Sequence, residues 1–275
     1  NAPQDSLAIG MAQAQLQMIA LQYEQALATL AQLRIRDPKH SHVLGLLAQV
    51  YCELHDWDSL AKLIPELTKN KALPAADIDT LELETRRQLL MLPLPSGASG
   101  ILRKSWNAVP PYLRQHPQLV AIYAQHLIDL GEMQECESLL ASAIEHNWDQ
   151  TLVRLYGLVQ GRDPAAQMDT ALEWLNRQPD DASVLLTLGR LALRGKMPGK
   201  ARDYLEKAIT LNGPLEAYHE LGKLLDQAGE HAEAIALYNR AMERCAKELR
   251  TAARNAGSPA HVRSGKTPAT ADYGY

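Results

Sequence analysis

A repeat of 33 residues near the C-terminal end constrains the fold of this chain more than any other feature. Residues 182–213 and 215–246 align with four matching pairs: Gly189 with Gly222, Ala201 with Ala234, Leu205 with Tyr238, and Ala208 with Ala241. A fixed period of this length is typical of repeat proteins, in which each unit is one small supersecondary element. The small residues would let two antiparallel helices approach closely, and the larger residues would fill the space between successive pairs.

The pattern resembles the tetratricopeptide repeat, whose period is about 34 residues, with Gly or Ala, an aromatic residue and a closing Pro at set offsets. This resemblance implies an all-α fold, a right-handed α-solenoid of tetratricopeptide-like helix pairs. The first helix of each pair would line a concave groove. One pair cannot bury its apolar face alone, so we expect further pairs upstream.

The same offsets recur in the N-terminal part of the chain. A first repeat runs from Leu7 to Pro38, and its Ala14 has a counterpart, Ala48, 34 residues later. The period then fails over an irregular pair at about residues 77–116. There we expect a helix at 77–92, a loop at 93–100 and a helix at 101–115 that Pro110 and Pro111 interrupt.

Regular spacing returns at Pro117, a looser unit covers residues 150–179, and the two strong repeats follow. We therefore predict one solenoid of about six helix pairs over residues 1–250. Residues 251–275 are polar, rich in Gly, Pro, Ser and Thr, and without helical periodicity, so we expect a flexible C-terminal tail.

Composition narrows the class of function. The chain of 275 residues has no Phe and a net charge of −4 with acids and bases mixed, which argues against nonspecific nucleic-acid binding. Its three cysteines have no metal-site spacing, and no apolar run is long enough to span a membrane. No catalytic motif is present either, so we predict that the protein is not an enzyme and holds no metal.

Several short motifs are similar to the C-terminal region of the HemY family, a bacterial inner-membrane repeat protein associated with haem biosynthesis. The motifs are Trp106 with Pro110, Trp148-Asp149 with Leu152 and Tyr156, Glu173-Trp174-Leu175 with Pro179, Leu188-Gly189-Arg190-Leu191, and Gly199-Lys200-Ala201-Arg202 with Tyr204-Leu205. The resemblance spans about residues 7–245. It implies membrane-spanning segments ahead of the repeats, missing from this fragment, which is itself soluble, and a repeat region on the cytoplasmic side of the inner membrane. It carries over no enzymatic activity.

The repeat offsets also predict which side chains face the groove. These residues are Met11, Gln15, Met18, His42, Gln49, Gln125, Arg154, Arg190, Arg194, His219, Lys223 and Asp226. Arginine forks bind carboxylates, so the basic C-terminal half suits an acidic peptide or a chain terminus. The two methionines would offer a soft apolar surface, although Met at helical spacing is more often core. The alternative for the charges is a solvated face with no ligand.

We therefore predict a protein–protein interaction scaffold whose groove takes a peptide or helix, with haem-pathway enzymes as candidate partners. One alternative is a haem or porphyrin carrier, for which His219 is the candidate axial ligand; otherwise no cofactor is predicted. Another is an array that acts in self-association through the apolar face of residues 7–18 or through the tail. The tryptophans, Trp57, Trp106, Trp148 and Trp174, are expected to pack between helices with each indole N–H satisfied at the edge.

Overall fold

The computed structural model describes residues 2–95 and 97–256, and every regular element in that part of the chain is a helix. The first eight α-helices are α1 (Ala2–Ile19), α2 (Tyr23–Arg36), α3 (Ser41–Glu53), α4 (Trp57–Lys69), α5 (Ala75–Leu90), α6 (Ser99–Asn107), α7 (Pro117–Asp129) and α8 (Met133–His146). The remaining six are α9 (Gln150–Tyr156), α10 (Pro164–Arg177), α11 (Ala182–Arg194), α12 (Pro198–Thr210), α13 (Leu215–Gln227) and α14 (His231–Ala256). One 3-10 turn, η1 (Pro111–Leu113), lies between α6 and α7. The predicted all-α array of helix pairs is confirmed.

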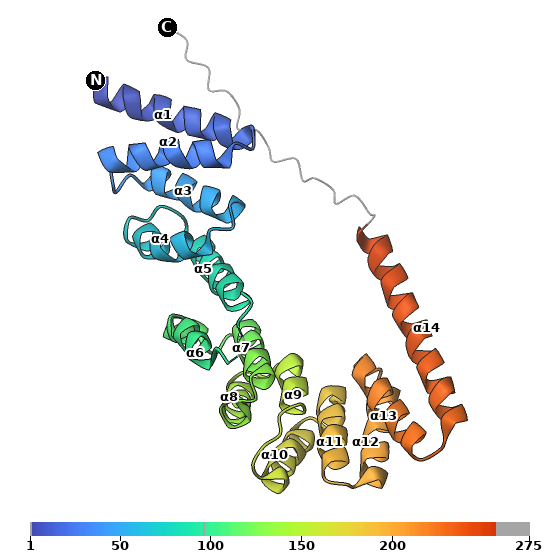
Figure 1. Cartoon of the computed structure of the whole chain (residues 1–275). Helices are drawn as coiled ribbons and strands as arrows, with labels where there is room; N and C mark the ends of the chain where they lie inside the picture. The colour runs from blue at the N-terminus through green and yellow to red at the C-terminus, as the bar shows by residue number, and fades with distance from the viewer. Residues whose placement is uncertain (1, 96, 257–275) are drawn as a thin grey trace. The chain divides into compact units, whose positions relative to one another are not determined.

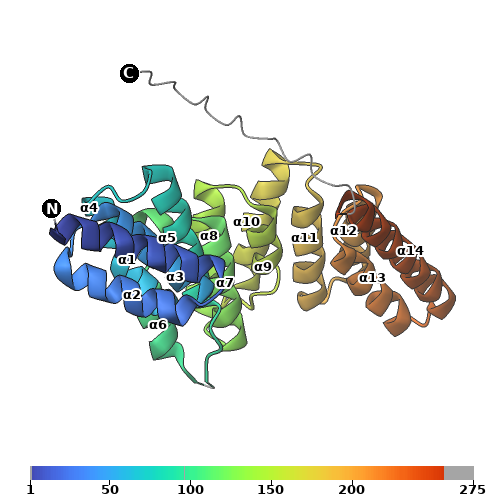
Figure 2. The same cartoon turned by 90° about the horizontal axis from the view of Figure 1, so that it is seen from above.

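The chain divides into two compact units, Asn1–Arg177 and Gln178–Tyr275. Within the first unit, α1 packs on α2, α2 on α3 and α3 on α4, which Figure 1 shows as a stack of neighbouring helices. Within the second unit, α11, α12, α13 and α14 pack in chain order (Figure 2). The fourteen α-helices of the described residues make seven consecutive pairs, where the repeat offsets predicted about six.

Close helix approach in the second unit depends on the aligned glycines. A Cβ on Gly189 of α11 would lie only 2.7 Å from Cδ2 of Leu205 on α12. A Cβ on Gly222 of α13 would overlap the ring of Tyr238 on α14 in the same way. Because each glycine faces the large residue of its own pair, the 33-residue period places the same packing contact twice. This confirms the predicted role of the small residues.

The turn inside each regular pair contains a left-handed residue. The left-handed residues of these turns are Leu21 (φ 58°), His55 (φ 56°), Gly131 (φ 75°), Lys196 (φ 55°) and Gly229 (φ 81°). A left-handed residue just past a helix end reverses the chain and lets its N–H reach back to the last carbonyl groups. Glycine adopts this conformation without steric penalty, whereas a residue with a Cβ atom does so at a steric cost. Three of these five turns therefore store backbone strain.

The core of the first pairs follows helical spacing. On α4 the side chains of Leu60, Leu63, Ile64 and Leu67 are at most 2% exposed, so one face of the helix is buried. These residues belong to a cluster that begins at Ala14 and continues to Ile78 on α5. Burying a Leu or Ile side chain stabilises a fold by about 1.5–3 kcal/mol.

In the irregular pair, the first helix and the loop agree with the sequence prediction, but the second helix does not. Helix α6 ends at Asn107, and the segment that was predicted to be helical to residue 115 contains only η1. Pro110 and Pro111 lack an N–H, and Pro110 is extended (ψ 142°), so the helix cannot continue. Arg114 closes the bend by donating from Nε to the Val109 carbonyl and from Nη2 to the Asn107 carbonyl, both at 2.9 Å.

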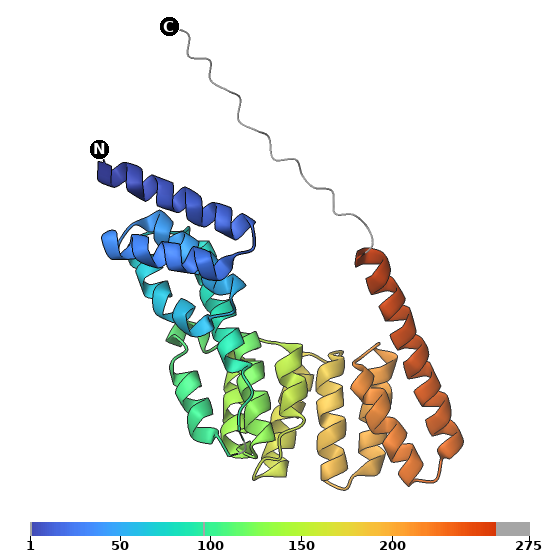
Figure 3. The same cartoon turned by 45° about the horizontal axis from the view of Figure 1, so that its top comes forward.

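Helix α14 is longer than predicted. It continues to Ala256, so the tail boundary at residue 250 is wrong, and Figure 3 shows the helix running past α13. The sequence ELRTAARNA explains the extension, because most of its residues are good helix formers. The remainder of the predicted tail, residues 257–275, lies outside the described residues. No helix of the described residues combines the length and the apolar character needed to cross a membrane.

Candidate partner-binding surfaces

The basic residues predicted for the second unit lie on its first helices, α11 and α13. Arg190 and Lys223 occupy equivalent register positions, 33 residues apart. The Arg190 side chain is only 10% exposed, and its Nε donates to Oε1 of Glu220 on α13 over 3.1 Å. Arg190 is therefore a link between two neighbouring first helices. Arg194 is the last residue of α11 and is half-buried. Its positive charge interacts favourably with the negative end of the helix dipole.

Lys223 and His219 form the accessible part of this surface. They are four residues apart on α13, so they share one face of that helix, and both are exposed. Neither makes a hydrogen bond or an ion pair with another described residue. We refer to Arg190, Glu220, His219 and Lys223 as the α11–α13 face. Its ammonium and imidazole groups are available to a ligand, while its guanidinium is held by a carboxylate.

Asp226, another predicted groove residue, also contacts α14. Its Oδ1 lies 3.2 Å from Nδ1 of His231, and its Oδ2 accepts a hydrogen bond of 3.4 Å from the Tyr238 hydroxyl. Burial and the charge of Asp226 raise the pKa of Tyr238 above its usual value. The carboxylate therefore connects α13 to the start of α14.

The other predicted groove residues belong to the first unit. Gln49 on α3 and Gln125 on α7 are exposed, and Gln125 donates to Oδ1 of Asp129 on its own helix over 3.0 Å. Arg154 on α9 is half-buried, and its Nη2 lies 3.4 Å from Oγ1 of Thr151. Since Arg154 belongs to one unit and the other basic residues to the other, their convergence stays a prediction.

Met11 and Met18 pack against the core of the first pairs and are half-buried. Their apolar surface is therefore largely used inside the unit. On the same helix, Gln15 lies 3.3 Å from the His42 ring on α3, a contact between two first helices.

Sequence reasoning missed a series of ion pairs between the second helices of neighbouring pairs. Arg34 on α2 contacts Glu66 on α4 at 2.7 Å, and in the second unit Arg202 on α12 contacts Glu230 at 2.9 Å and Glu233 at 3.0 Å. Similar pairs join Arg103 to Glu135 at 2.8 Å and Arg177 to Glu145 at 2.7 Å. A recurring Arg and Glu offset near 32 residues was the signal that could have found them.

Two tryptophans confirm the expected packing role. Trp174 is fully buried, and its indole N–H donates to Oε1 of Glu145 over 2.9 Å. Trp106 stacks on Tyr123 with ring centroids 4.3 Å apart. Both rings lie between helices of the first unit.

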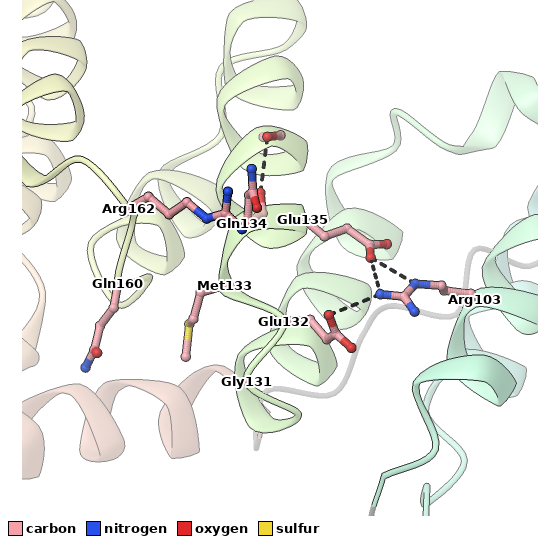
Figure 4. Close-up of a pocket in the computed structure, with 9 residues that line it drawn as sticks. Arg103, Gly131, Glu132, Met133, Gln134, Glu135, Gln160 and Arg162 are labelled. Carbon is pink, nitrogen blue, oxygen red and sulfur yellow. Dashed lines mark hydrogen bonds and ion pairs between the residues drawn. The ribbon is translucent and has the colours of Figure 1, made fainter.

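A polar pocket of about 590 Å³ opens in the first unit beside the start of α8 (Figure 4). Arg103 donates to Glu135 at 2.8 and 3.0 Å and lies 3.1 Å from Glu132. Burial works against ionisation of Glu135, yet hydrogen bonds from Tyr123 and Arg103 outweigh it and lower the pKa of this carboxyl. Burial and the same carboxylate raise the pKa of Tyr123. Two carboxylates already pair with Arg103. This arginine therefore links α6 to α8 and is not available to bind an anion.

Part of the chain is similar in sequence to a family of repeat proteins. Residues 186–248 match the family model described as tetratricopeptide repeat, a segment that covers most of α11 and reaches into α14. No curated protein sequence matches the chain. One similar solved structure is a chain of the APC/C hetero-tetramer Cut9–Hcn1, with 17% identity and a TM-score of 0.42 over 87% of this chain and 54% of that chain. This chain thus spans about half the length of that relative.

Two structures of MamA are also similar. One has 14% identity and a TM-score of 0.31 over 90% of this chain and 96% of that chain. The other has 14% identity and a TM-score of 0.32 over 86% of this chain and 96% of that chain. Residues 186–248 are thus similar in sequence to the tetratricopeptide repeat family, and the described residues have its helix-pair arrangement.

Proposed function

We propose that this protein is an interaction scaffold in which the α11–α13 face binds an acidic segment of a partner protein. The observation that carries the proposal is the exposure of Lys223 and His219 on a helix that an ion pair fixes to its neighbour. Fixed helices present the two side chains without an ordering cost for the backbone. A carboxylate on the partner would pair with the Lys223 ammonium. Because this ion pair would be mainly exposed, it would affect the association rate and its salt dependence more than the affinity.

The finer identity of the partner rests on the resemblance to the HemY family. The motifs around Trp106, Trp148, Trp174 and Gly189 support a role associated with haem biosynthesis. On this proposal the partner is an enzyme of the haem pathway, and the repeat region is tethered to the bacterial inner membrane on its cytoplasmic side. The role is scaffolding rather than catalysis.

Crosslinking and pull-down from native membranes test the proposal. Lys223→Glu reverses the exposed charge, and Lys247→Glu on α14 is the matched control, because Lys247 is also exposed. Arg190 is left unchanged, since a carboxylate there would repel Glu220. We expect a defined partner to be captured by the wild type and the control and lost with Lys223→Glu. Equal capture by all three proteins would place partner binding elsewhere.

A second candidate function, self-association, is favoured by the outer face of α1. Ile9, Leu16 and Ile19 on this helix are 68%, 66% and 78% exposed, while Met11 and Met18 pack into the core. These three side chains form an exposed apolar stripe on a helix whose Met11 and Met18 face the core, and a second copy of the chain is the occupant we propose for this stripe. Light scattering should show a dimer that Leu16→Glu dissociates and that Ile35→Glu, on α2, does not. A wild-type protein that stays monomeric as its concentration rises would contradict this role.

A further inference from the structure

A pocket of about 460 Å³ lies between α4, α5 and α6 in the first unit. Its lining includes Leu90 and Val109, which are 3% and 1% exposed, and Leu92 and Ile101, which are 50% and 53% exposed. The pocket therefore has a buried apolar floor and an accessible apolar mouth. Exposed aliphatic side chains gathered at a concavity are a feature of ligand sites in soluble proteins.

The same pocket carries three cations. Lys62 on α4 and Lys104 on α6 are exposed and make no hydrogen bond or ion pair with another described residue. Arg86 on α5 is the third, and Asp58 is the one carboxylate among the described lining residues. The lining thus has an excess of positive charge beside its apolar floor.

Arg86 is fixed in place by its neighbours. Its side chain is 14% exposed, and its Nη2 lies 3.3 Å from Oε1 of Glu82. The other carboxylate oxygen of Glu82 accepts a hydrogen bond of 2.5 Å from the Tyr112 hydroxyl. The Nε of Arg86 is buried and has no acceptor among the described residues. A buried donor without an acceptor is rare, and a ligand oxygen would satisfy it.

A second pocket, lined by the N-terminal half of α5, shows why the charge pattern matters. It has a volume of about 910 Å³ and an apolar lining, but Lys69 and Lys71 there are balanced by Asp79 and Glu82. The pocket between α4, α5 and α6 instead combines an apolar floor with Lys62 and Lys104, which pair with no carboxylate of the described residues.

We propose that the pocket between α4, α5 and α6 binds an aliphatic carboxylate. The carboxylate would pair with Lys62, Lys104 and Arg86, and the alkyl group would lie against Leu90, Leu92, Ile101 and Val109. Two sources share this chemistry: a free fatty acid, or the last residue of a peptide that ends in an apolar side chain. The proposal is independent of the α11–α13 face.

Titration of the ¹⁵N-labelled protein with four probes tests the proposal. The probes are octanoate, octan-1-ol, N-acetyl-Ala-Leu with a free carboxylate, and the amide of that dipeptide. We expect the amide signals of residues that line the pocket to shift with at least one carboxylate and not with octan-1-ol or the dipeptide amide. Binding of octanoate alone identifies a fatty acid as the source, and binding of the dipeptide acid alone identifies a chain terminus.

The variants separate charge recognition from general hydrophobic binding. Lys62→Ala with Lys104→Ala should weaken carboxylate binding about tenfold or more, because each lost charged hydrogen bond has an effect of that order. Lys39→Ala with Lys69→Ala removes the same charge from exposed sites outside the pocket and should leave binding unchanged. The proposal is overturned if neither carboxylate binds, if octan-1-ol binds as tightly as octanoate, or if the first double variant binds like the wild type.

Discussion

The Nε of Arg190 on α11 lies 3.1 Å from Oε1 of Glu220 on α13, and both side chains are largely buried. Arg190 therefore holds two first helices of the second unit together. The Arg190–Glu220 ion pair therefore also fixes the position of the neighbouring Lys223 and His219, to which we propose that a partner binds.

Removal of Arg190 should destabilise the protein by leaving a carboxylate without its cation. We expect Arg190→Gln to lower the free energy of unfolding by about 1–3 kcal/mol, the penalty for a largely buried polar group that loses its partner. Arg190→Gln combined with Glu220→Gln should recover part of that loss. Urea unfolding of the four proteins in this double-mutant cycle measures the coupling, and strictly additive effects would show that the pair contributes nothing.

The glycines of the repeat should resist even the smallest substitution. Gly222→Ala places a methyl group against the Tyr238 ring, so we expect a loss of about 1–3 kcal/mol in the free energy of unfolding, as in an overpacked core. Gly199→Ala, in the first turn of α12, meets nothing within 4 Å and serves as the control. That control should be neutral or slightly stabilising, because Ala favours helix over Gly. Equal thermal unfolding curves for Gly222→Ala and the wild type would refute the close approach.

A substitution in the turn between α11 and α12 should stabilise the protein. Lys196 has a φ of 55°, so Lys196→Gly relieves steric strain and should raise the free energy of unfolding by about 1 kcal/mol. Lys196→Ala removes the same side-chain charge and keeps the strain, so it should show no gain. Chemical denaturation of both variants checks the prediction, which fails if glycine and alanine behave alike.

Acid should weaken the contact between α8 and α10. Hydrogen bonds from Arg177 and then from Trp174 lower the pKa of Glu145 in the folded state, so the unfolded chain binds a proton more readily. The stabilising contribution is therefore complete above the unfolded pKa of about 4.3 and is lost as the pH falls through the lower folded value. Glu145→Gln should be less stable than the wild type at pH 7, and the difference should shrink below about pH 4.3. A difference that stays constant from pH 7 to pH 3 would rule out this linkage.

The sequence predicted close helix approach at Gly189 and Gly222, because small residues let two helices touch. It placed Leu205 and Tyr238 between successive pairs, whereas each lies against the glycine of its own pair. The end of α6 was misplaced, since Pro110 and Pro111 stop a helix but do not say where the last turn before them unwinds.

The candidate surfaces were harder to predict, because they depend on which polar groups find partners. Arg190 and Lys223 look equivalent in the sequence, yet Glu220 holds only the former. Asp226 remains a predicted groove residue and is exposed, but its carboxylate also contacts His231 and Tyr238 on the next helix. The pocket between α4, α5 and α6 lies where the period fails, so no repeat offset could indicate it.

The ion pairs between second helices limit how this chain can change in length. Arg34 and Glu66, Arg103 and Glu135, and Glu145 and Arg177 each stand 32 residues apart. An insertion of one residue inside either helix of such a pair would rotate one partner by about 100° and carry its charge off the shared face. Insertions in the connecting turns would leave both helix faces as they are. During evolution, lengthening or shortening should therefore be accepted in the turns and purged from the helices that carry these arginines and glutamates.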